Sequence, residues 1–232
     1  MANTLFLRLE GPLQAWGERG RWSVRDTASE PTKSGVIGLV ACALGYHTDA
    51  QIRPLAEKTR MAVRCDAPGQ LITDYHTVGG GYDYPTLLTA QGKPKLSSGS
   101  PHTELTWRDY LCDASFLVAL QSQDEVLIEQ MAQALQHPVW PVYLGRKSCP
   151  PSRPVFDGVG HFDDLEEALQ WGSWSLTVKP PKSPVVRCVL ETLDIDGVRR
   201  RDQILSRQYR QFGPRYTKDK NDIPIVIEVE AS

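Results

Sequence analysis

The sequence predicts an α+β fold in which helices pack on an antiparallel sheet. Apolar and polar residues alternate along 5–9, which is typical of a strand with one face on a core. An apolar segment at 34–44 is apolar on every side and indicates a buried helix. The other predicted elements are strands at 60–66, 71–77, 114–120 and 142–144 and a helix at 125–136. Their order along the chain is that of a ferredoxin-like βαββαβ unit.

Local signals define the ends of several elements. Proline cannot donate to a strand ladder, so Gly11-Pro12 is expected to end the first strand. Gly45 is placed to stop the first helix, and Asp124 is a natural N-cap for the second. A short acidic helix at 162–171 is expected to be a surface insertion.

The C-terminal part is expected to form a smaller β region. Residues 179–184, KPPKSP, resemble a linker. Strands are predicted at 185–193 and 223–229, on either side of a basic stretch at 199–220. We therefore divide the 232 residues into a ferredoxin-like domain at 1–178 and a C-terminal β region at 179–232 packed on it.

Composition excludes several classes of protein. The formal net charge of −2 argues against a wholly basic nucleic-acid binder, although it leaves local basic patches open. We find no apolar run of membrane-spanning length and no signal peptide, so no membrane partner is expected. Five scattered cysteines without a CxxC pair fit free thiols in the cytoplasm, and no metal or other cofactor is expected.

A glycine- and serine-rich stretch interrupts the ferredoxin-like order. Residues 78–106 show no apolar period, and a stretch of this length inside a domain is normally functional or disordered. We interpret an insertion at about 78–107 as a protruding β-hairpin, or thumb. The alternative is a mobile loop without a role.

Three polar segments are candidates for binding nucleic acid. The first runs from Gln14 to the start of the helix at 32–35, where free N–H groups attract anions. Its tryptophans and arginines suit bases and phosphates. A capped helix that follows a surface loop with core tryptophans explains the same residues, and these residues alone favour that simpler interpretation.

The second and third candidate segments lie further along the chain. Residues 142–156 hold Arg146, Lys147 and Arg153 and no acidic residue, which suits either an anion site or a solvated turn. Residues 199–220 hold eight Lys or Arg residues against two Asp, with aromatic residues between them. This basic stretch could bind nucleic acid or form a basic edge that docks on a ribonucleoprotein. The alternative is a solvated hairpin.

Three motifs in register identify a family. LRLEGPLQAWG, PTKSGVIGLVACALG and YLGRKSCPPSRPV resemble the CasD family, the handle-binding subunits of the type I-E CRISPR Cascade complex. The resemblance covers nearly the whole chain. It implies a modified ferredoxin-like core of the RNA-recognition-motif type, a thumb and a smaller C-terminal β region.

The family resemblance also implies a function and partners. Such a subunit holds the 5′ handle of the CRISPR RNA, caps the helical backbone, contacts the backbone subunit and helps dock the large subunit that serves target-DNA recognition. It is expected not to be an enzyme. The expected RNA-binding residues are Gln14, Trp16, Arg19, Arg21, Arg25, Thr32, Lys33, Ser34, Gly35, His76, Arg108, Tyr143, Gly145, Arg146, Lys147, Ser148 and Cys149.

A rival hypothesis is a metal-independent endoribonuclease that processes precursor RNA, as related type I-C subunits do. Tyr46, His47 and His76 are the residues that would then act on a ribose 2′-hydroxyl. A third hypothesis is a stand-alone RNA-binding module that works without partner subunits.

Overall fold

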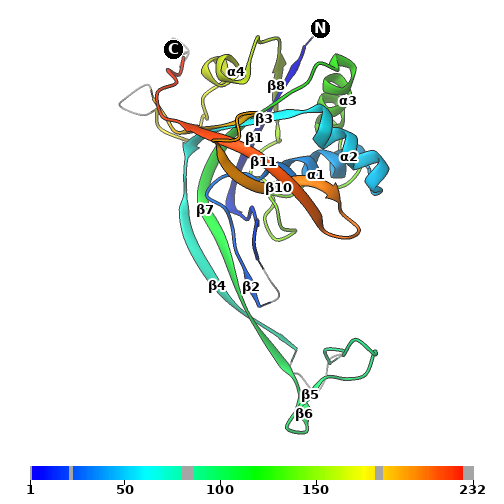
Figure 1. Cartoon of the computed structure of the whole chain (residues 1–232). Coiled ribbons are helices and arrows are strands. Elements are labelled where there is room, and N and C mark those ends of the chain that lie inside the picture. The colour runs from blue at the N-terminus through cyan, green and yellow to red at the C-terminus, as the bar shows by residue number, and fades with distance from the viewer. Residues whose placement is uncertain (1, 21–22, 80–85, 181–184, 227–232) are drawn as a thin grey trace.

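The computed structural model describes residues 2–20, 23–79, 86–180 and 185–226. Its main feature is a nine-stranded sheet that carries helices on both faces and extends into a long hairpin (Figure 1). The strands are β1 (Thr4–Gln14), β2 (Val24–Arg25), β3 (Arg60–Ala67), β4 (Gln70–Gly79), β5 (Leu96–Ser97), β6 (Ser100–Pro101), β7 (Thr103–Gln121), β8 (Phe156–Gly160), β9 (Cys188–Thr192), β10 (Val198–Ser206) and β11 (Gln211–Lys220). The helices are α1 (Lys33–Leu44), α2 (Asp49–Lys58), α3 (Glu125–Gln136) and α4 (Leu165–Trp171).

The main path of the sheet follows the order β10-β11-β9-β3-β7-β1-β8, with antiparallel neighbours. The C-terminal strands therefore continue the same sheet, because β9 pairs with β3. The predicted short strand at 142–144 is absent from the described residues. Its place beside β1 is taken by β8, so the predicted position of that strand was wrong.

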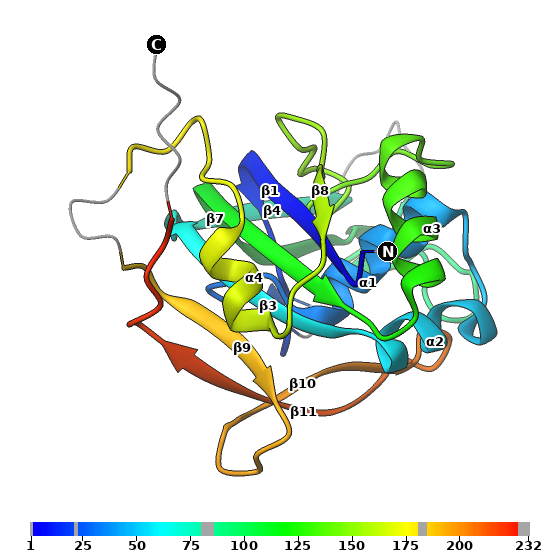
Figure 2. The ribbon, with the colours of Figure 1, turned by 90° about the horizontal axis from the view of Figure 1, so that it is seen from above.

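Helices α1, α2 and α3 cover one face of the sheet, and α4 lies apart from them on the other (Figure 2). The predicted helix at 125–136 is confirmed, and Asp124 caps it by accepting a hydrogen bond from the Leu127 N–H at 3.1 Å. Gly45 ends α1 in the left-handed region, with a φ of 72°. These ends follow from local capping chemistry, which is why sequence patterns predict them well.

Strand β1 is buried on both faces, whereas its alternation suggested a single buried face. Leu5, Leu7 and Leu9 face the three-helix side, and Phe6 packs with Leu165 of α4 in the second core. Helix α4 is thus part of the core and not a surface insertion, which corrects that prediction. Nor does the strand end at Gly11-Pro12, since β1 continues to Gln14.

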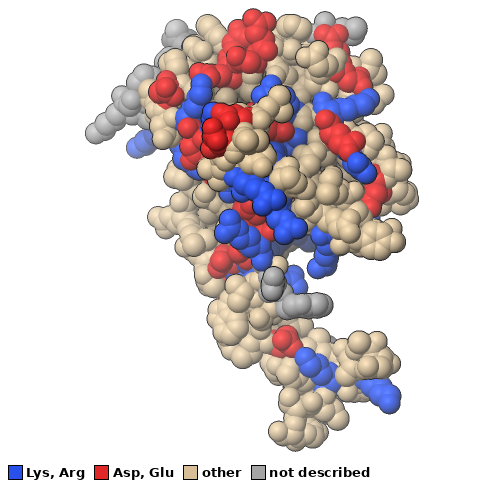
Figure 3. Space-filling model, viewed as in Figure 1, with Lys and Arg blue, Asp and Glu red and all other residues tan. Residues whose placement is uncertain are grey.

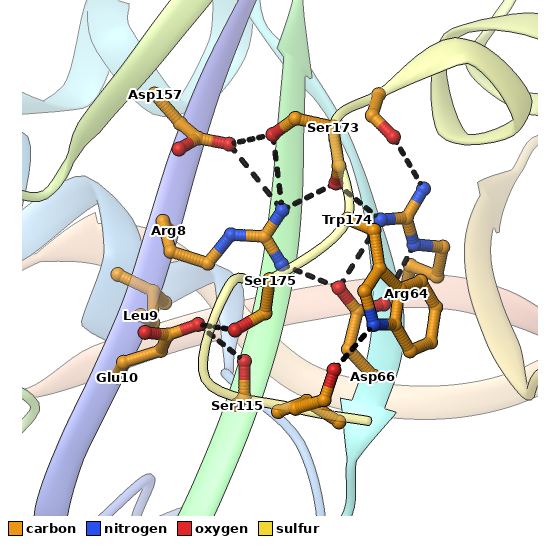
Figure 4. Close-up of polar contacts among 12 residues, drawn as sticks. Arg8, Leu9, Glu10, Arg64, Asp66, Ser115, Asp157, Ser173, Trp174 and Ser175 are labelled. Carbon is orange, nitrogen blue, oxygen red and sulfur yellow. Dashed lines mark hydrogen bonds and ion pairs between the residues drawn. The ribbon is translucent and has the colours of Figure 1, made fainter. Parts of the chain in front are cut away.

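The α4 face also holds a buried network of charges (Figure 4). Arg8 of β1 and Arg64 of β3 both donate to the carboxylate of Asp66, at 2.5 and 2.6 Å, and both donate to the backbone carbonyl of Ser173. All three charged side chains are fully buried. The network explains how arginines occur at core positions: each charge is paired, and the pairs fasten the segment after α4 to the sheet.

The hairpin is longer than predicted. Strand β4 pairs with the first half of β7 from Gln70↔Cys112 to Gly79↔Thr103, and together they project away from the body (Figure 1). The predicted strand at 71–77 therefore belongs to this hairpin and has no pairing with β3. Part of the insertion, residues 80–85, lies outside the described residues, as do residues 181–184 of the predicted linker and 227–229 of the predicted last strand.

Candidate nucleic-acid interface

Segments far apart in the sequence line one groove of about 490 Å³. Its walls come from residues 15–17, the start of α1, the loop at 143–145 and the β10–β11 hairpin. All three motifs singled out in the sequence thus contribute to the groove, and the basic hairpin closes its other side. We use "the groove" for this cavity from here on.

Two of these loops are in direct contact at Gly145. The backbone N–H of Ala15 donates to the carbonyl of Leu144 at 3.0 Å. Gly145 has a φ of 85°, and a Cβ added to it would lie 1.7 Å from the carbonyl oxygen of Ala15. Only glycine fits such a position, so the loops can meet because this residue has no side chain.

Arg146 joins its own loop to residues 25–26 and to the base of the hairpin. Its guanidinium donates to the backbone carbonyls of Asp109, Arg25 and Asp26 at 3.0, 2.9 and 3.2 Å. It also lies over the ring of Tyr110, 4.7 Å from the centroid. These contacts direct the charge of Arg146 into the protein, so its main role in this geometry is to hold the site together.

The N-terminus of α1 is occupied by the chain's own groups. Thr32 accepts from the Gly35 N–H at 3.3 Å, and Asp202 of β10 accepts from the Lys33 N–H at 2.8 Å. A carboxylate is the kind of anion that a helix N-terminus attracts. Asp202 already supplies a negative charge at this terminus, which agrees with the capped-helix interpretation, and Ser34 and Gly35 line the groove.

Lys33, Gln14 and Trp16 are also used inside the protein. The Lys33 ammonium donates to the Thr59 carbonyl and pairs with Glu191, and burial lowers its pKa although Glu191 raises it. The indole of Trp16 is 1% exposed and donates to Gln14, whose amide donates in turn to two backbone carbonyls. Lys33 and Trp16 therefore have partners inside the protein, and their place among the RNA-binding residues stays a prediction.

The exposed candidates lie around this framework. Arg19, Arg25, Lys147 and Ser148 are exposed to solvent. Arg108 pairs in register with Arg25, where β2 meets β7, and its Nε donates to Thr106. Arg21 lies outside the described residues.

Cys149 is buried, and burial raises the pKa of its thiol. Its backbone carbonyl accepts from the Leu144 N–H at 2.8 Å, so it closes the loop that carries Gly145 and Arg146. Tyr143, from the same loop, lines the groove. Cys149 therefore has a structural position, whereas Tyr143 is open to a ligand.

The residues of the rival nuclease hypothesis are on separate elements. Tyr46 follows α1 and lines the groove, and the carbonyl of its neighbour His47 accepts from Arg207. His76 lies on β4 in the projecting hairpin, 3.5 Å from Asp74. The described structure thus places His76 on the hairpin and the other two beside α1.

Three residues of the basic hairpin line the groove but are not among the expected RNA-binding residues. Arg207, Arg210 and Phe212 belong to the β10–β11 hairpin and line the groove opposite α1. Lys and Arg side chains gather over this hairpin on the molecular surface (Figure 3). The signal was visible as basic residues interleaved with aromatics, but only the fold shows which side of the hairpin faces the motifs.

This geometry defines a class of protein: a mixed α/β chain with a large antiparallel sheet, a projecting hairpin and a cationic groove at its base. The model of the CRISPR-associated protein family Cas5 (Cas_Cas5) matches residues 4–218. The chain belongs to this family. No helix among the described residues is long and apolar enough to cross a membrane.

Known relatives agree with this assignment. The chain is 40% identical over 175 residues to the CRISPR system Cascade subunit CasD of Escherichia coli (strain K12). The matched region covers 73% of this chain and 76% of the relative. A chain of the solved structure "CRISPR RNA-guided surveillance complex" is similar with a TM-score of 0.75 and 29% identity, over 97% of this chain and 90% of that one. The structure "Crystal structure of Cas protein" is similar with a TM-score of 0.69 and 34% identity, over 95% of both chains.

Proposed function

We propose that this chain is a Cascade subunit that binds the 5′ handle of a CRISPR RNA in the groove and at the base of the hairpin. The observation that carries the proposal is the meeting of the 15–17 and 143–145 loops opposite the basic hairpin. Single-stranded RNA is held by phosphate contacts and by contacts to splayed bases. The groove offers both kinds of surface, since Tyr143 and Phe212 line it together with Arg207 and Arg210.

The proposed site has an outer layer that contacts RNA and an inner layer that shapes it. The outer layer consists of Tyr143, Ser148, the exposed cations Arg19, Arg25 and Lys147, and the partly exposed Arg108. Gln14, Trp16, Thr32, Lys33, Arg146 and Cys149 form the inner layer, because their polar groups are engaged within the protein. His76 is assigned to the face of the hairpin near Arg108.

A ferredoxin-like core of the RNA-recognition-motif type is part of the proposal. Support comes from the strand order β3-β7-β1-β8, in which α1 connects β1 to β3 and α3 connects β7 to β8. This is the order that a βαββαβ unit produces. The β9–β11 strands extend that sheet as the C-terminal β region.

The proposed partners follow from family membership. We assign the subunit to one end of the backbone, with the projecting β4–β7 hairpin as the thumb that reaches the first backbone subunit and with a role in docking the large subunit. Contact with target DNA is then indirect. Five free cysteines suit work in the cytoplasm.

The first test replaces Lys147 by alanine. Lys147 is exposed, so its loss should leave folding intact and remove one phosphate contact. For single strands, log K falls with log salt, and each lost contact makes this dependence less steep by about 0.7. Filter binding of handle-containing CRISPR RNA over a range of salt concentrations measures this slope.

A matched control is Lys58→Ala, an exposed lysine of α2 that pairs with Asp124. This control should leave the slope unchanged. Equal slopes for wild type, Lys147→Ala and the control would remove the 143–149 loop from the RNA interface. If wild type itself does not bind the handle, the proposed function fails.

We further propose that the subunit does not cut RNA. Purified protein incubated with precursor CRISPR RNA and EDTA should leave the RNA intact. Cleavage that disappears in Tyr46→Phe or His76→Ala would instead identify a metal-independent ribonuclease.

A further inference from the structure

A second cationic concavity adjoins the groove and is lined by four arginines, which we call the arginine cluster: Arg19, Arg199, Arg201 and Arg210. The concavity has a volume of about 620 Å³, and Phe212 lies in its lining. All four arginines are exposed. Within the described part of the chain, none of the four guanidinium groups forms an ion pair or a hydrogen bond.

The inward-facing arginines of the same hairpin are neutralised. Arg215 makes a two-pronged contact with Asp202, at 2.9 and 2.7 Å. Arg200 pairs with both Glu18 and Glu30. Because successive side chains of a strand point to opposite faces, Arg199 and Arg201 lie on the other side from Arg200. The arginines on one face of the hairpin are thus neutralised, whereas Arg199 and Arg201 on the other face have no counter-charge among the described residues.

The one carboxylate in the concavity does not cancel this charge. Glu18 is part of the lining, but its side chain is only 8% exposed. One of its oxygens accepts from Arg200, and the other accepts from the Arg201 N–H at 3.3 Å. Glu18 therefore positions the hairpin against the 15–20 loop and leaves the four guanidinium groups free for an outside anion.

The arginine cluster is continuous with the groove. Arg210 and Phe212 line both cavities. They also line a third depression, which contains Arg25 and Arg146. An RNA strand that fills the groove can therefore continue over Phe212 and past Arg210 into the arginine cluster.

We propose that the arginine cluster binds the phosphodiester backbone of single-stranded RNA next to the groove, with Phe212 as a surface for a base. This inference rests on the proposed function and extends its binding site to the C-terminal hairpin. Guanidinium groups match phosphate oxygens in a fork-like geometry, and an aromatic ring between cations is typical of single-strand binding surfaces. An acidic protein segment would use the cations but has no need of the aromatic ring, so RNA fits the whole cluster better.

The test is the double variant Arg199→Gln/Arg201→Gln in the full-length chain. Both side chains are exposed and lack partners in the described structure, so the variant should fold like wild type. Loss of two phosphate contacts should lower the salt slope for handle-containing CRISPR RNA by about 1.4. Affinity at low salt should fall by about tenfold.

The control is Arg53→Gln/Lys58→Gln, which removes two exposed charges from α2. It should retain the wild-type slope. If wild type binds RNA with a salt slope that the cluster variant does not change, this inference is overturned while the proposed function stands. Unchanged RNA binding with lost co-purification of a Cascade subunit would likewise overturn it and identify the cluster as a protein contact.

Discussion

The Oδ2 atom of Asp202 lies 2.8 Å from the backbone nitrogen of Lys33 and accepts its hydrogen bond. The same carboxylate is held by Arg215 across the β10–β11 hairpin. One buried aspartate thus joins the C-terminal hairpin to the start of α1. Both elements line the groove, so this contact sets the distance between its two walls.

Asp202→Asn should destabilise the chain by about 3 kcal/mol. The amide oxygen can still accept from the Lys33 N–H, but Arg215 loses its main counter-charge while it remains buried. Urea unfolding followed by circular dichroism measures the difference. Asp194→Asn is the control, because Asp194 pairs with Lys218 on the surface of the same region, and it should cost much less than Asp202→Asn.

The contribution of Asp202 should depend on pH. Burial raises its pKa, but the hydrogen bonds and charge of Arg215 outweigh burial and hold the pKa below the ordinary value. A carboxylate of this kind stabilises the fold above its unfolded pKa of about 3.9 and loses that effect as the pH falls through the folded pKa. The stability gap between wild type and Asp202→Asn should be constant near neutrality and shrink below about pH 4. A gap that stays the same in acid would contradict this account.

Gly145→Ala should disrupt the groove. Its new Cβ would overlap the carbonyl oxygen of Ala15, so the two loops must separate. Gly99→Ala is a matched control, since Gly99 has a similar φ of 81° but open space around it. The control should cost about 1 kcal/mol from backbone strain alone. Gly145→Ala should cost more in urea unfolding and should also weaken RNA binding; equal costs would show that the loop contact is unimportant.

Arg146→Lys preserves the charge but should destabilise the site by about 2 kcal/mol. A lysine cannot reach three carbonyls and cover the ring of Tyr110 at once. Thermal unfolding compares this variant with Arg53→Lys, an exposed change on α2 that should have no measurable effect. Wild-type stability in Arg146→Lys would mean that charge alone matters at this position.

Asp66→Asn tests the buried network on the α4 face. It leaves Arg8 and Arg64 without their shared carboxylate, which should cost about 3 to 5 kcal/mol. Trp174 lies 5.3 Å from the Arg64 guanidinium, so its near-ultraviolet circular dichroism should change as the segment loosens. Glu57→Gln, in an exposed pair on α2, should alter neither measurement.

Elements with local signals were predictable from the sequence. Helix α3 has a capping aspartate and a regular apolar face, and both signals lie within its own residues. Helix α1 is uniformly apolar and ends at a glycine. The basic residues of 199–220 were visible in the sequence, but the strands β10 and β11 that carry them were not predicted. The cap and the apolar face of a helix depend on residues that are close in the sequence, so a sequence pattern can detect them.

Errors arose where distant residues decide. Arg8 and Glu10 gave β1 the pattern of a half-exposed strand, but α4 and the segment after it supply partners for both side chains, including Ser175 for Glu10. Nor does the sequence show that Glu191 lies beside Lys33 and pairs with it. The residue type alone did not reveal which polar side chains already have a partner inside the protein.

The sequence by itself determined the family, the main helices and the three motifs from which the groove is built, because those properties are written in residue type and spacing. Only the tertiary structure decided which cations face outward. Asp202, Glu18 and Glu191 reach their basic partners from distant strands and loops, and the charges they neutralise are removed from the surface. What remains available to a ligand is the set of cations that the folded chain leaves without a counter-charge.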